Sequence, residues 1–238
     1  MKVVILAGGL GTRISEETDL KPKPMVQIGN QPIIWHIMNS FAIQGFNDFA
    51  IATGYKGQVI HDWVQSLKTD WKVQAIDTGL DTQTGGRINR VFSILEASKL
   101  LVTYGDALGN IDVNLLMKFH ADHHKIATIT AVRPPARFGV LESENGLVKN
   151  FGEKRQSDAG WINGGYFVLD REVTKHIHSD DEPFEQGALQ RLVERQELMS
   201  FHHHGFWQPM DTLREKVILH EMVSAGKQPW LDIAGKKN

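Results

Sequence analysis

The stretch that decides the fold is Val3-Val4-Ile5-Leu6-Ala7-Gly8-Gly9-Leu10-Gly11-Thr12-Arg13. It begins with an apolar run of strand length that is rich in β-branched residues, and two glycines end that run. This pattern predicts a central parallel strand that is buried on both faces of a sheet. The glycines would then lie at the carboxyl end of the strand, which is where open α/β sheets place their ligands.

Outward from this strand, helical and strand-like patterns alternate along the chain. A helical apolar face at residues 34–41 and a strand-like run at 49–52 predict a β-α-β unit. Further helices are predicted around 59–67, 88–95 and 113–123, and further strands at 71–76, 100–104 and 127–132. The alternation predicts an α/β fold with a mainly parallel, Rossmann-like mixed sheet that carries helices on both faces.

The pattern changes after about residue 133, where short strand-like pieces are separated by proline, glycine and charged turns. Strands are predicted at 139–141, 147–151 and 161–169, and helices near 170–178, 184–195 and 212–225. The sequence contains neither a Pro/Ser-rich linker nor a repeat. We therefore expect one domain over residues 1–234, followed by a polar tail at 235–238.

The composition limits the classes of protein to which the chain can belong. Apolar residues make up 41% of the 238 residues, which is enough for a full core, and the sequence lacks an apolar run long enough to cross a membrane. The formal charge of −2 argues against broad nucleic-acid binding, which uses a strongly basic face. Zero cysteines exclude disulfides and thiolate chemistry. These properties predict a cytoplasmic protein with neither a nucleic-acid nor a membrane partner.

The glycine-rich part of the first stretch has the chemistry of a phosphate-binding loop. Glycines allow backbone N–H groups to approach an anion closely, Thr12 adds a hydroxyl group, and Arg13 supplies a fork of donors. The loop lacks the Gly-Lys-Ser/Thr of the P-loop, and Ile14 stands where the dinucleotide fingerprint has its third glycine. The alternative is a tight turn that needs glycine for backbone reasons alone. That alternative leaves the appended Thr12 and Arg13 unexplained.

A second cationic segment, Lys21-Pro22-Lys23-Pro24-Met25, follows shortly afterwards. Its prolines fix φ and push the residues before them into extended geometry. A lysine held in a rigid segment is suited to meet an anion. The alternative is a solvated loop with spare charge, and the nearby Gly-Thr-Arg favours the functional interpretation.

Taken in order, these motifs resemble the signature of the sugar-phosphate nucleotidylyltransferases. The resemblance continues through Phe138-Gly139, Glu153-Lys154, Asn163-Gly164-Gly165 and residues 207–212, and it covers residues 1 to about 230. Residues 77–79, 84–87, 103–106 and 205–214 are similar to those of glucose-1-phosphate cytidylyltransferases. The resemblance implies a nucleotide-diphospho-sugar transferase fold. It also implies an enzyme that joins an NTP, in the first place CTP, to α-D-glucose 1-phosphate and releases pyrophosphate.

The resemblance also implies which residues form the site. Arg13 would contact the triphosphate and Lys23 the incoming sugar phosphate, which attacks directly without an enzyme nucleophile. Nucleotide contacts are implied for the loop residues Leu6, Ala7, Gly8, Gly9, Gly11 and Thr12, and base contacts for Thr84, Gly86 and Arg87. Sugar contacts are implied for Tyr104, Gly105, Gly139, Glu153, Lys154, Asn163 and Gly164. Arg155 replaces the proline that commonly follows Glu153-Lys154, and Gly85-Gly86 could instead be a flexible turn.

Two carboxylates from opposite halves of the chain, Asp106 and Asp211, are implied to hold one Mg²⁺ against the phosphates. The alternatives are a turn residue for Asp106 and a helix N-cap for Asp211. An N-cap role for Asp211 could coexist with a metal role. The run His202-His203-His204 raises the further alternative of a zinc-type site. Because successive strand residues point to opposite faces, we interpret these histidines as ordinary strand residues.

Two functional alternatives remain open. The first keeps the chemistry but uses another nucleotide or another phosphorylated acceptor on a surface-polysaccharide pathway, because the pocket and not the fold decides the substrate. The second is a nucleotide-sugar-binding subunit without turnover. The intact set of Arg13, Lys23, Asp106 and Asp211 argues against the second alternative.

The resemblance also bears on assembly. The segment between the predicted helix at 59–67 and Asp77 is shorter than in similar cytidylyltransferases, where it helps subunits to meet. We expect a homo-oligomer smaller than a hexamer, such as a dimer, in which residues 84–87 read the base within one subunit. The alternative is that other surfaces preserve the larger assembly.

Overall fold

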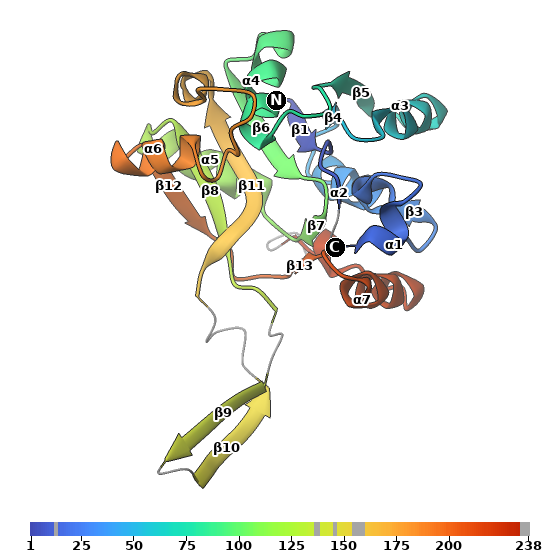
Figure 1. The fold of residues 1–238 in the computed structure, drawn as a ribbon, viewed down its shortest axis with the longest axis vertical. Helices are drawn as coiled ribbons and strands as arrows, with labels where there is room; N and C mark the ends of the chain where they lie inside the picture. Colours follow the sequence, from blue (N-terminus) through green and yellow to red (C-terminus); the bar gives the residue numbers. More distant parts are fainter. Residues whose placement is uncertain (12–13, 136–138, 145–146, 154–159, 234–238) are drawn as a thin grey trace.

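A seven-stranded sheet forms the centre of the protein, in the order β12-β8-β11-β6-β1-β4-β5 (Figure 1). The structure is a computed structural model, which describes residues 1–11, 14–135, 139–144, 147–153 and 160–233. The strands of this sheet are β1 (Val3–Leu6), β4 (Asp48–Thr53), β5 (Lys72–Asp77), β6 (Lys99–Tyr104), β8 (Ala127–Val132), β11 (Ile162–Asp170) and β12 (Leu198–His202).

The first strand, β1, lies in the middle of the parallel part of the sheet. It pairs in parallel with β4 on one side and with β6 on the other. The pairs β4–β5 and β8–β12 are parallel as well, whereas β11 runs antiparallel to both of its neighbours, β6 and β8. This arrangement confirms the predicted mainly parallel, mixed α/β sheet.

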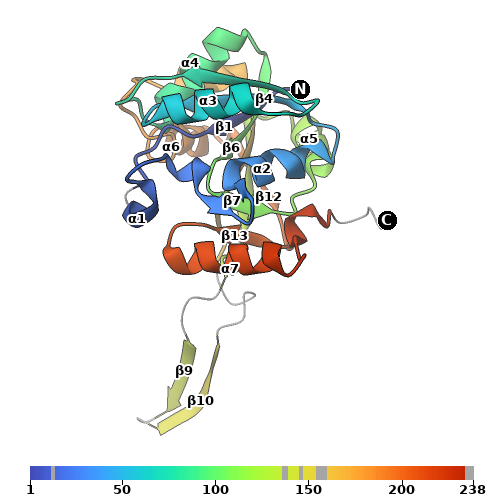
Figure 2. The same ribbon diagram turned by 90° about the vertical axis from the view of Figure 1, so that its right-hand side faces the viewer.

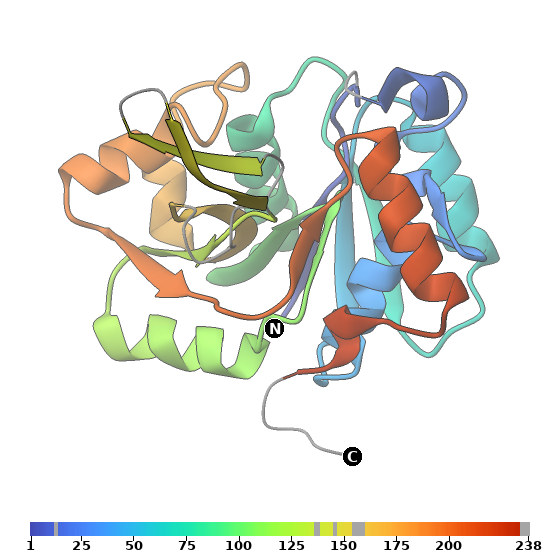
Figure 3. The same cartoon turned by 90° about the horizontal axis from the view of Figure 1, so that it is seen from below.

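Both faces of the sheet are covered, because alternate residues of β1 belong to different cores. Val3 and Ile5 share a core with α2 (Ile33–Ala42), α3 (Gly57–Ser66), α5 (Val113–His123) and α7 (Leu213–Ser224). Val4 and Leu6 share the other core with α4 (Thr84–Leu95), the 3-10 helix η4 (Arg171–His176) and α6 (Ala188–Glu194). Figure 2 shows α2, α3 and α7 on the side that faces the viewer, and Figure 3 shows α6 and α7 on opposite sides of the molecule. Among the helices that the structure describes, none combines the length and apolar character needed to span a membrane.

Short strand pairs complete the fold. β7 (Ala107–Gly109) pairs antiparallel with β13 (Trp207–Pro209), which brings the chain after β6 next to the chain before α7. β2 (Gln27–Ile28) pairs with β3 (Gln31–Pro32). β9 (Gly139–Glu144) and β10 (Leu147–Glu153) form a hairpin that extends away from the sheet in Figure 1. The connections contain α1 (Ser15–Thr18) and two 3-10 helices, η2 (Lys23–Met25) and η5 (Pro229–Leu231).

Two predicted helices differ from the structure. Residues 170–178 contain the 3-10 helix η4 in place of an α-helix. The helix predicted over 184–195 begins only at Ala188, because the carbonyl of Pro183 accepts turn hydrogen bonds from the N–H groups of Gln186 and Gly187. The residues before the helix pack against the first turn of α4 instead, with Phe184 fully buried.

Candidate functional site

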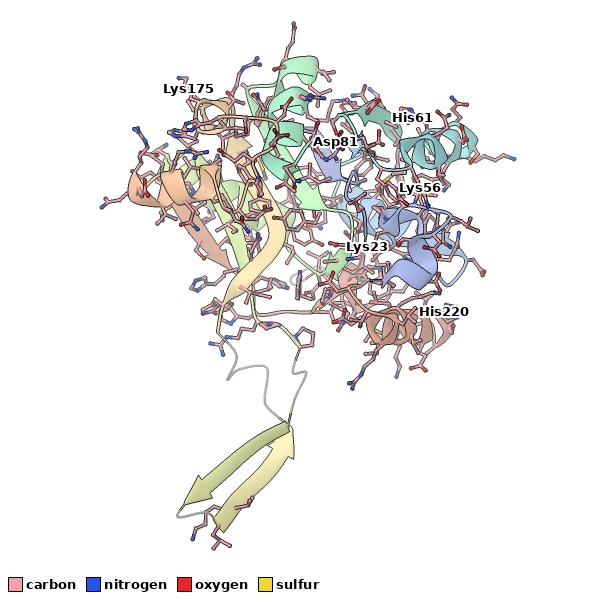
Figure 4. All side chains as sticks on the ribbon, viewed as in Figure 1. Lys23, Lys56, His61, Asp81, Lys175 and His220 are labelled. Carbon is pink, nitrogen blue, oxygen red and sulfur yellow. The ribbon has the colours of Figure 1, made fainter. Side chains whose placement is uncertain are left out.

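A pocket of about 850 Å³ opens at the carboxyl edge of the parallel strands. Its walls begin directly after β1 and β6 and include the connection from β5 to α4, which is where an open α/β sheet binds ligands. Lys23 lies in the interior of the protein, between the residues that precede β7 and those that precede α7 (Figure 4). The described residues that line the pocket are Leu6, Ala7, Gly8, Gly9, Leu10, Gly11, Lys23, Pro24, Tyr55, Leu80, Asp81, Thr82, Gln83, Thr84, Arg87, Tyr104, Gly105, Asp106 and Asp211.

The glycine loop after β1 requires a glycine at position 11. Gly11 has a φ of +68°, and a Cβ there would lie 3.0 Å from Thr18 Cγ2 and 3.1 Å from Lys23 Cβ. Thr18 Oγ1 donates to the carbonyl of Gly11 at 3.2 Å, which ties the loop to α1. Thr12 and Arg13, which the sequence analysis assigns to the nucleotide, lie outside the described residues.

Lys23 stands between the two carboxylates expected to bind metal. Its Nζ lies 2.7 Å from Asp106 Oδ2 and 2.6 Å from Asp211 Oδ1. Pro22, just before η2, and Pro24 flank it, and the lysine side chain is only 10% exposed. Three residues singled out from distant parts of the sequence therefore meet at one point of the pocket.

The pairing of β7 with β13 explains how Asp106 and Asp211 come together. The N–H of Met210 donates to the carbonyl of Asp106 at 2.8 Å. Gly105, just before Asp106, passes so close to η2 that a Cβ would lie 2.9 Å from Pro24 Cγ. The backbone at this position therefore needs a glycine.

Asp211 precedes α7 but does not cap it. Thr212 is the N-cap residue, and it forms a capping box with Glu215. The Glu215 carboxylate also accepts the N–H of Asp211 at 2.7 Å. The N-cap alternative for Asp211 is therefore wrong, and the Asp211 carboxylate is directed to Lys23.

The electrostatics of this triad favour a cation between the carboxylates. Burial by itself lowers the pKa of Lys23, but the charges and hydrogen bonds of Asp106 and Asp211 outweigh burial and raise the pKa. Mg²⁺ is commonly held in proteins by one or two carboxylates together with phosphate oxygens and water. Because Asp106 and Asp211 converge on one cationic point, the donor set fits the expected metal.

Arg87 holds the loops around the pocket. Its side chain is buried, and burial lowers the pKa of the guanidinium. From the sequence this group is expected to read the base, whereas in the structure it donates to acceptors of the protein itself. These acceptors are the carbonyls of Gly8 (3.0 Å), Thr53 (2.8 Å), Gly79 (2.8 Å) and Leu80 (3.3 Å), and Thr78 Oγ1 (2.7 Å). The guanidinium thus links the glycine loop to the ends of β4 and β5.

Asn163 and Gly164, expected at the sugar, lie behind the described lining residues and contact groups next to the pocket. Asn163 Nδ2 donates to Tyr104 Oη at 3.1 Å, and Tyr104 lines the pocket. The carbonyl of Gly164 accepts the indole N–H of Trp207 at 2.9 Å. Gly165 has a φ of +77°, and a Cβ there would lie 2.6 Å from Tyr104 Cδ2. These contacts fix the position of the Tyr104 ring.

The first turn of α4 contains Thr84 and Gly86, which the sequence analysis assigns to the base. Thr84 lines the pocket, whereas Gly86 packs against the segment 180–185. A Cβ at Gly86 would lie 2.6 Å from Asp180 Cα, and the N–H of Gly85 donates to the carbonyl of Glu182 at 3.1 Å. The flexible-turn alternative for Gly85-Gly86 is therefore wrong, because both glycines lie in a helix that a neighbouring segment contacts closely.

The remaining expected sugar residues lie elsewhere in the chain. Gly139 begins β9 and Glu153 ends β10, in the hairpin outside the sheet, and Lys154 lies outside the described residues. Several lining residues that follow the strand ends were not predicted from the sequence, including Tyr55 after β4 and residues 80–83 after β5. Their position after parallel strands is the signal that could have found them.

Of the three consecutive histidines, His202 ends β12, whereas His203 and His204 follow the strand. The prediction of strand residues is therefore wrong for His203 and His204. His202 stacks on Trp161 with ring centroids 4.3 Å apart, and His204 contacts the same ring at 5.1 Å. Nε2 of His203 lies 3.1 Å from the carbonyl oxygen of Phe206. In the part of the chain that the structure describes, there is no group of three or more His, Cys, Asp or Glu residues that could hold a metal ion.

Comparisons with known proteins agree with this geometry. Residues 2–234 match the nucleotidyl transferase family. The chain is 45% identical over 253 aligned residues to the glucose-1-phosphate cytidylyltransferase of Salmonella typhi, covering 97% of this chain and 98% of that protein. It is 38% identical to a probable glucose-1-phosphate cytidylyltransferase of Bacillus subtilis, covering 97% and 99%. Among solved structures, HddC from Yersinia pseudotuberculosis complexed with GMP-PN is similar, with a TM-score of 0.73, 27% identity and coverage of 93% and 99%.

Proposed function

Because the chain belongs to the nucleotidyl transferase family, we propose that it joins CTP to α-D-glucose 1-phosphate, giving CDP-glucose and pyrophosphate. The observation that carries the proposal is the meeting of Lys23, Asp106 and Asp211 in a pocket bounded by the glycine loop. Near-full-length similarity to glucose-1-phosphate cytidylyltransferases supports the choice of nucleotide and sugar.

The reaction brings two polyanions together, so the site has to neutralise charge and align the reacting atoms. An oxygen of the sugar phosphate attacks the α-phosphorus of CTP. The bond from that phosphorus to the bridging oxygen of the β-phosphate breaks, and pyrophosphate leaves. Lys23 is suited to bind the sugar phosphate, and Arg13 is proposed to bind the triphosphate.

Asp106 and Asp211 would hold Mg²⁺ against the phosphates of the nucleotide. When bound, the ion would neutralise phosphate charge and help to orient the α-phosphorus. In this arrangement the glycine loop binds phosphate oxygens through its N–H groups, and Arg87 keeps that loop in place through the carbonyl of Gly8. Thr84 is the residue of the first turn of α4 that is proposed to meet the base.

Further proposals rest on the sequence resemblance. We propose a single catalytic domain over residues 1–234 that acts in the cytoplasm as a homo-oligomer. The product would be a nucleotide sugar for surface-polysaccharide synthesis. Glu153 is proposed to bind sugar hydroxyls and Lys154 the sugar phosphate. Gly139, Asn163, Gly164, Tyr104 and Gly105 are proposed as the other sugar-binding positions, and Asn163 also donates a hydrogen bond to Tyr104.

A second candidate keeps the chemistry and changes the substrates. The chain is 32% identical over 90% of its length to the mannose-1-phosphate guanyltransferase of Emericella nidulans, of which it covers 62%. A guanine nucleotide with a different sugar phosphate is therefore the alternative to test. A binding subunit without turnover is disfavoured, because the charged triad is assembled in the pocket.

The test is a matrix of the four ribonucleoside triphosphates against glucose, mannose and galactose 1-phosphates, with pyrophosphate release and product mass as readouts. CTP with α-D-glucose 1-phosphate should turn over at least about tenfold faster than any other pair. Asp106→Asn and Asp211→Asn should remain folded and lose most turnover. Asp48→Asn, which removes a surface carboxylate paired with Lys2, should remain folded and keep its turnover. A different fastest pair would replace the proposed substrates, and product binding without turnover would favour the binding subunit.

A further inference from the structure

Two pocket hydroxyls, those of Tyr104 and Thr84, are tied to one carboxylate that the reaction does not otherwise use. Tyr104 Oη donates to Glu185 Oε1, and Thr84 Oγ1 donates to Glu185 Oε2 at 2.9 Å. Thr84 begins α4 and Tyr104 ends β6, so Glu185 joins two different walls of the pocket. The carboxylate itself lies behind these walls, outside the described lining.

The direction of the hydrogen bond at Tyr104 is set by a backbone N–H group. The N–H of Gly165 can only donate, and it does so to Asn163 Oδ1 at 2.8 Å. The Asn163 amide therefore turns its Nδ2 to Tyr104 Oη, which accepts at 3.1 Å. The proton of Tyr104 is left to Glu185. Burial and the charge of Glu185 also raise the pKa of Tyr104, so the phenol keeps its proton.

The direction at Thr84 is set in the same way. The N–H of Phe184 can only donate, and it donates to Thr84 Oγ1 at 2.8 Å. The single proton of the Thr84 hydroxyl then goes to Glu185, because an ionised carboxylate can only accept. Each hydroxyl thus gives its proton to Glu185 and also accepts one hydrogen bond from the protein, so any bond that it makes to a ligand is one that it accepts.

We propose that Glu185 is a specificity-determining positioning residue, which makes the Thr84 and Tyr104 walls of the pocket accept hydrogen bonds and not donate them. A ligand group that faces these walls has to be a donor. This inference rests on the proposed function, and it deepens that function by explaining how the base is chosen. Cytosine carries a donor amino group at C4, whereas uracil carries an acceptor carbonyl there. Thr84 therefore favours CTP over UTP, and Tyr104 accepts a hydroxyl of the sugar.

The contacts of the segment 180–185 explain why this carboxylate is held so firmly. The N–H of Gln83 donates to the carbonyl of Asp180 at 2.7 Å, and the N–H of Gly85 donates to that of Glu182 at 3.1 Å. Arg90 pairs with the Asp180 carboxylate. These bonds fix the segment to α4 on both sides of Thr84, so the Glu185 carboxylate is positioned before any ligand binds.

The test uses Glu185→Gln and Glu185→Ala in the full chain. Alanine removes the acceptor, so the hydroxyl protons of Thr84 and Tyr104 are free to point elsewhere. Glutamine has one acceptor group and one donor group, so it reverses the direction of at least one of the two hydrogen bonds. Glu182→Gln is the matched control. Glu182 lies on the same segment, three residues before Glu185, and its side chain pairs with Arg191. The readouts are the ratio of kcat/KM for CTP to that for UTP and, independently, the ratio of their dissociation constants by calorimetry.

The preference for CTP should fall about tenfold in Glu185→Ala, which is the size of one lost hydrogen bond, and less in Glu185→Gln. Thr84→Val should cause the same loss, and Glu185→Ala should add nothing in the Thr84→Val background, because Glu185 acts through that hydroxyl. Tyr104→Phe should change the KM for the sugar phosphate and not the base preference. A merely structural role would lower stability without moving these ratios.

The inference would be overturned by folded Glu185 variants that keep the wild-type preference, by additive effects of Thr84 and Glu185, or by an equal loss in Glu182→Gln. A wild-type protein that binds CTP and UTP equally would also overturn it. If binding follows the expected pattern but no pyrophosphate is released with any substrate pair, the inference stands. In that case only the proposed enzymatic function is contradicted.

Discussion

At the scale of single residues, Lys23 balances the charge of the pocket. Its ammonium group touches both Asp106 and Asp211, so removing it leaves two carboxylates facing one another. In Lys23→Gln without Mg²⁺, the free energy of unfolding should fall by about 1–3 kcal/mol. This is less than the cost of breaking a fully buried pair, because the Asp106 side chain is 34% exposed. Thermal melting in the presence of a chelator measures this loss.

The same variant should respond more strongly to Mg²⁺ than the wild type. Without the lysine, the ion no longer competes with a positive charge for the carboxylates, so Mg²⁺ should raise the melting temperature of Lys23→Gln by more. Lys216→Gln is the control, because Lys216 pairs with Glu17 and not with the proposed metal ligands Asp106 and Asp211. Equal Mg²⁺ responses in Lys23→Gln and wild type would contradict the prediction.

The sequence predicts individual site residues where a motif holds them rigidly, as at Lys23 between two prolines and Asp106 behind a glycine. Arg87 is different. Its partners are mainly backbone carbonyls, which every residue offers, so the sequence does not reveal that it bonds to three loops. Glu185 escaped prediction for a related reason. Its role depends on N–H groups of Gly165 and Phe184 that no side-chain pattern reveals.

At the scale of elements, the contact between α4 and the segment 180–185 depends on a missing side chain. Gly86 allows the Asp180 backbone to approach closely, and a Cβ would lie 2.6 Å from Asp180 Cα. Gly86→Ala should therefore displace the segment and lower the free energy of unfolding by about 1–3 kcal/mol. It should also weaken nucleotide binding, because Thr84 and Glu185 would separate. Denaturant melts and CTP titration measure the two effects.

Gly160→Ala provides the comparison for this change, since nothing lies within 4 Å of a Cβ at that position. It should alter neither stability nor CTP affinity by a measurable amount. A Gly86→Ala protein with wild-type stability would contradict the prediction, because α4 and the segment 180–185 would then separate without a loss of free energy of unfolding.

The long elements follow from local patterns, and the short ones do not. β1 and α2 were predictable because an apolar run and a helical apolar face need only neighbouring residues to be recognised. β7 and β13 are three residues each and exist because they pair with one another across the chain. That pairing is a tertiary contact, and it brings together Asp106 and Asp211, the two residues proposed to bind the metal.

Helix α5 carries a pH-sensitive contact with β8. His120 is 1% exposed, its Nδ1 lies 2.8 Å from Thr128 Oγ1, and His123 reaches the same oxygen at 2.7 Å. Burial, with Lys99 adding to it and Asp170 opposing it, lowers the pKa of His120. The unfolded chain therefore binds this proton more readily than the folded protein does. The contribution of neutral His120 to the free energy of unfolding is therefore fully present above the ordinary histidine pKa of about 6.5, and it is lost as the pH falls below that value.

Melting temperatures should accordingly fall between about pH 7.5 and pH 5.5, a window set by the unfolded histidine pKa. His120→Gln should flatten this fall, because glutamine does not titrate. The exposed His178 supplies the control, since His178→Gln should leave the pH dependence unchanged. A His120→Gln profile parallel to the wild type would remove His120 as a source of the effect.

At the scale of the whole molecule, the sheet order explains why the site could be foreseen. β1 lies between β4 and β6, so the loops after these strands converge at one edge of the sheet. Parallel strands ending in glycine or polar residues were enough to predict that edge. The distance of the β9–β10 hairpin from the sheet was not predictable, because a hairpin pattern contains no information on where the hairpin lies.

The edge of the sheet at β5 bears on assembly. α3 ends at Ser66 and β5 begins at Lys72, so the connection that the sequence resemblance implies to be longer in similar cytidylyltransferases is short here. β5 is the outermost strand, and Lys72, Gln74 and Asp77 on it are exposed, which disfavours pairing with another chain along this edge. With less surface for subunit contact near the nucleotide, we predict an oligomer smaller than a hexamer, such as a dimer. Light scattering at low micromolar concentration measures this directly, and a stable hexamer would show that other surfaces carry the assembly.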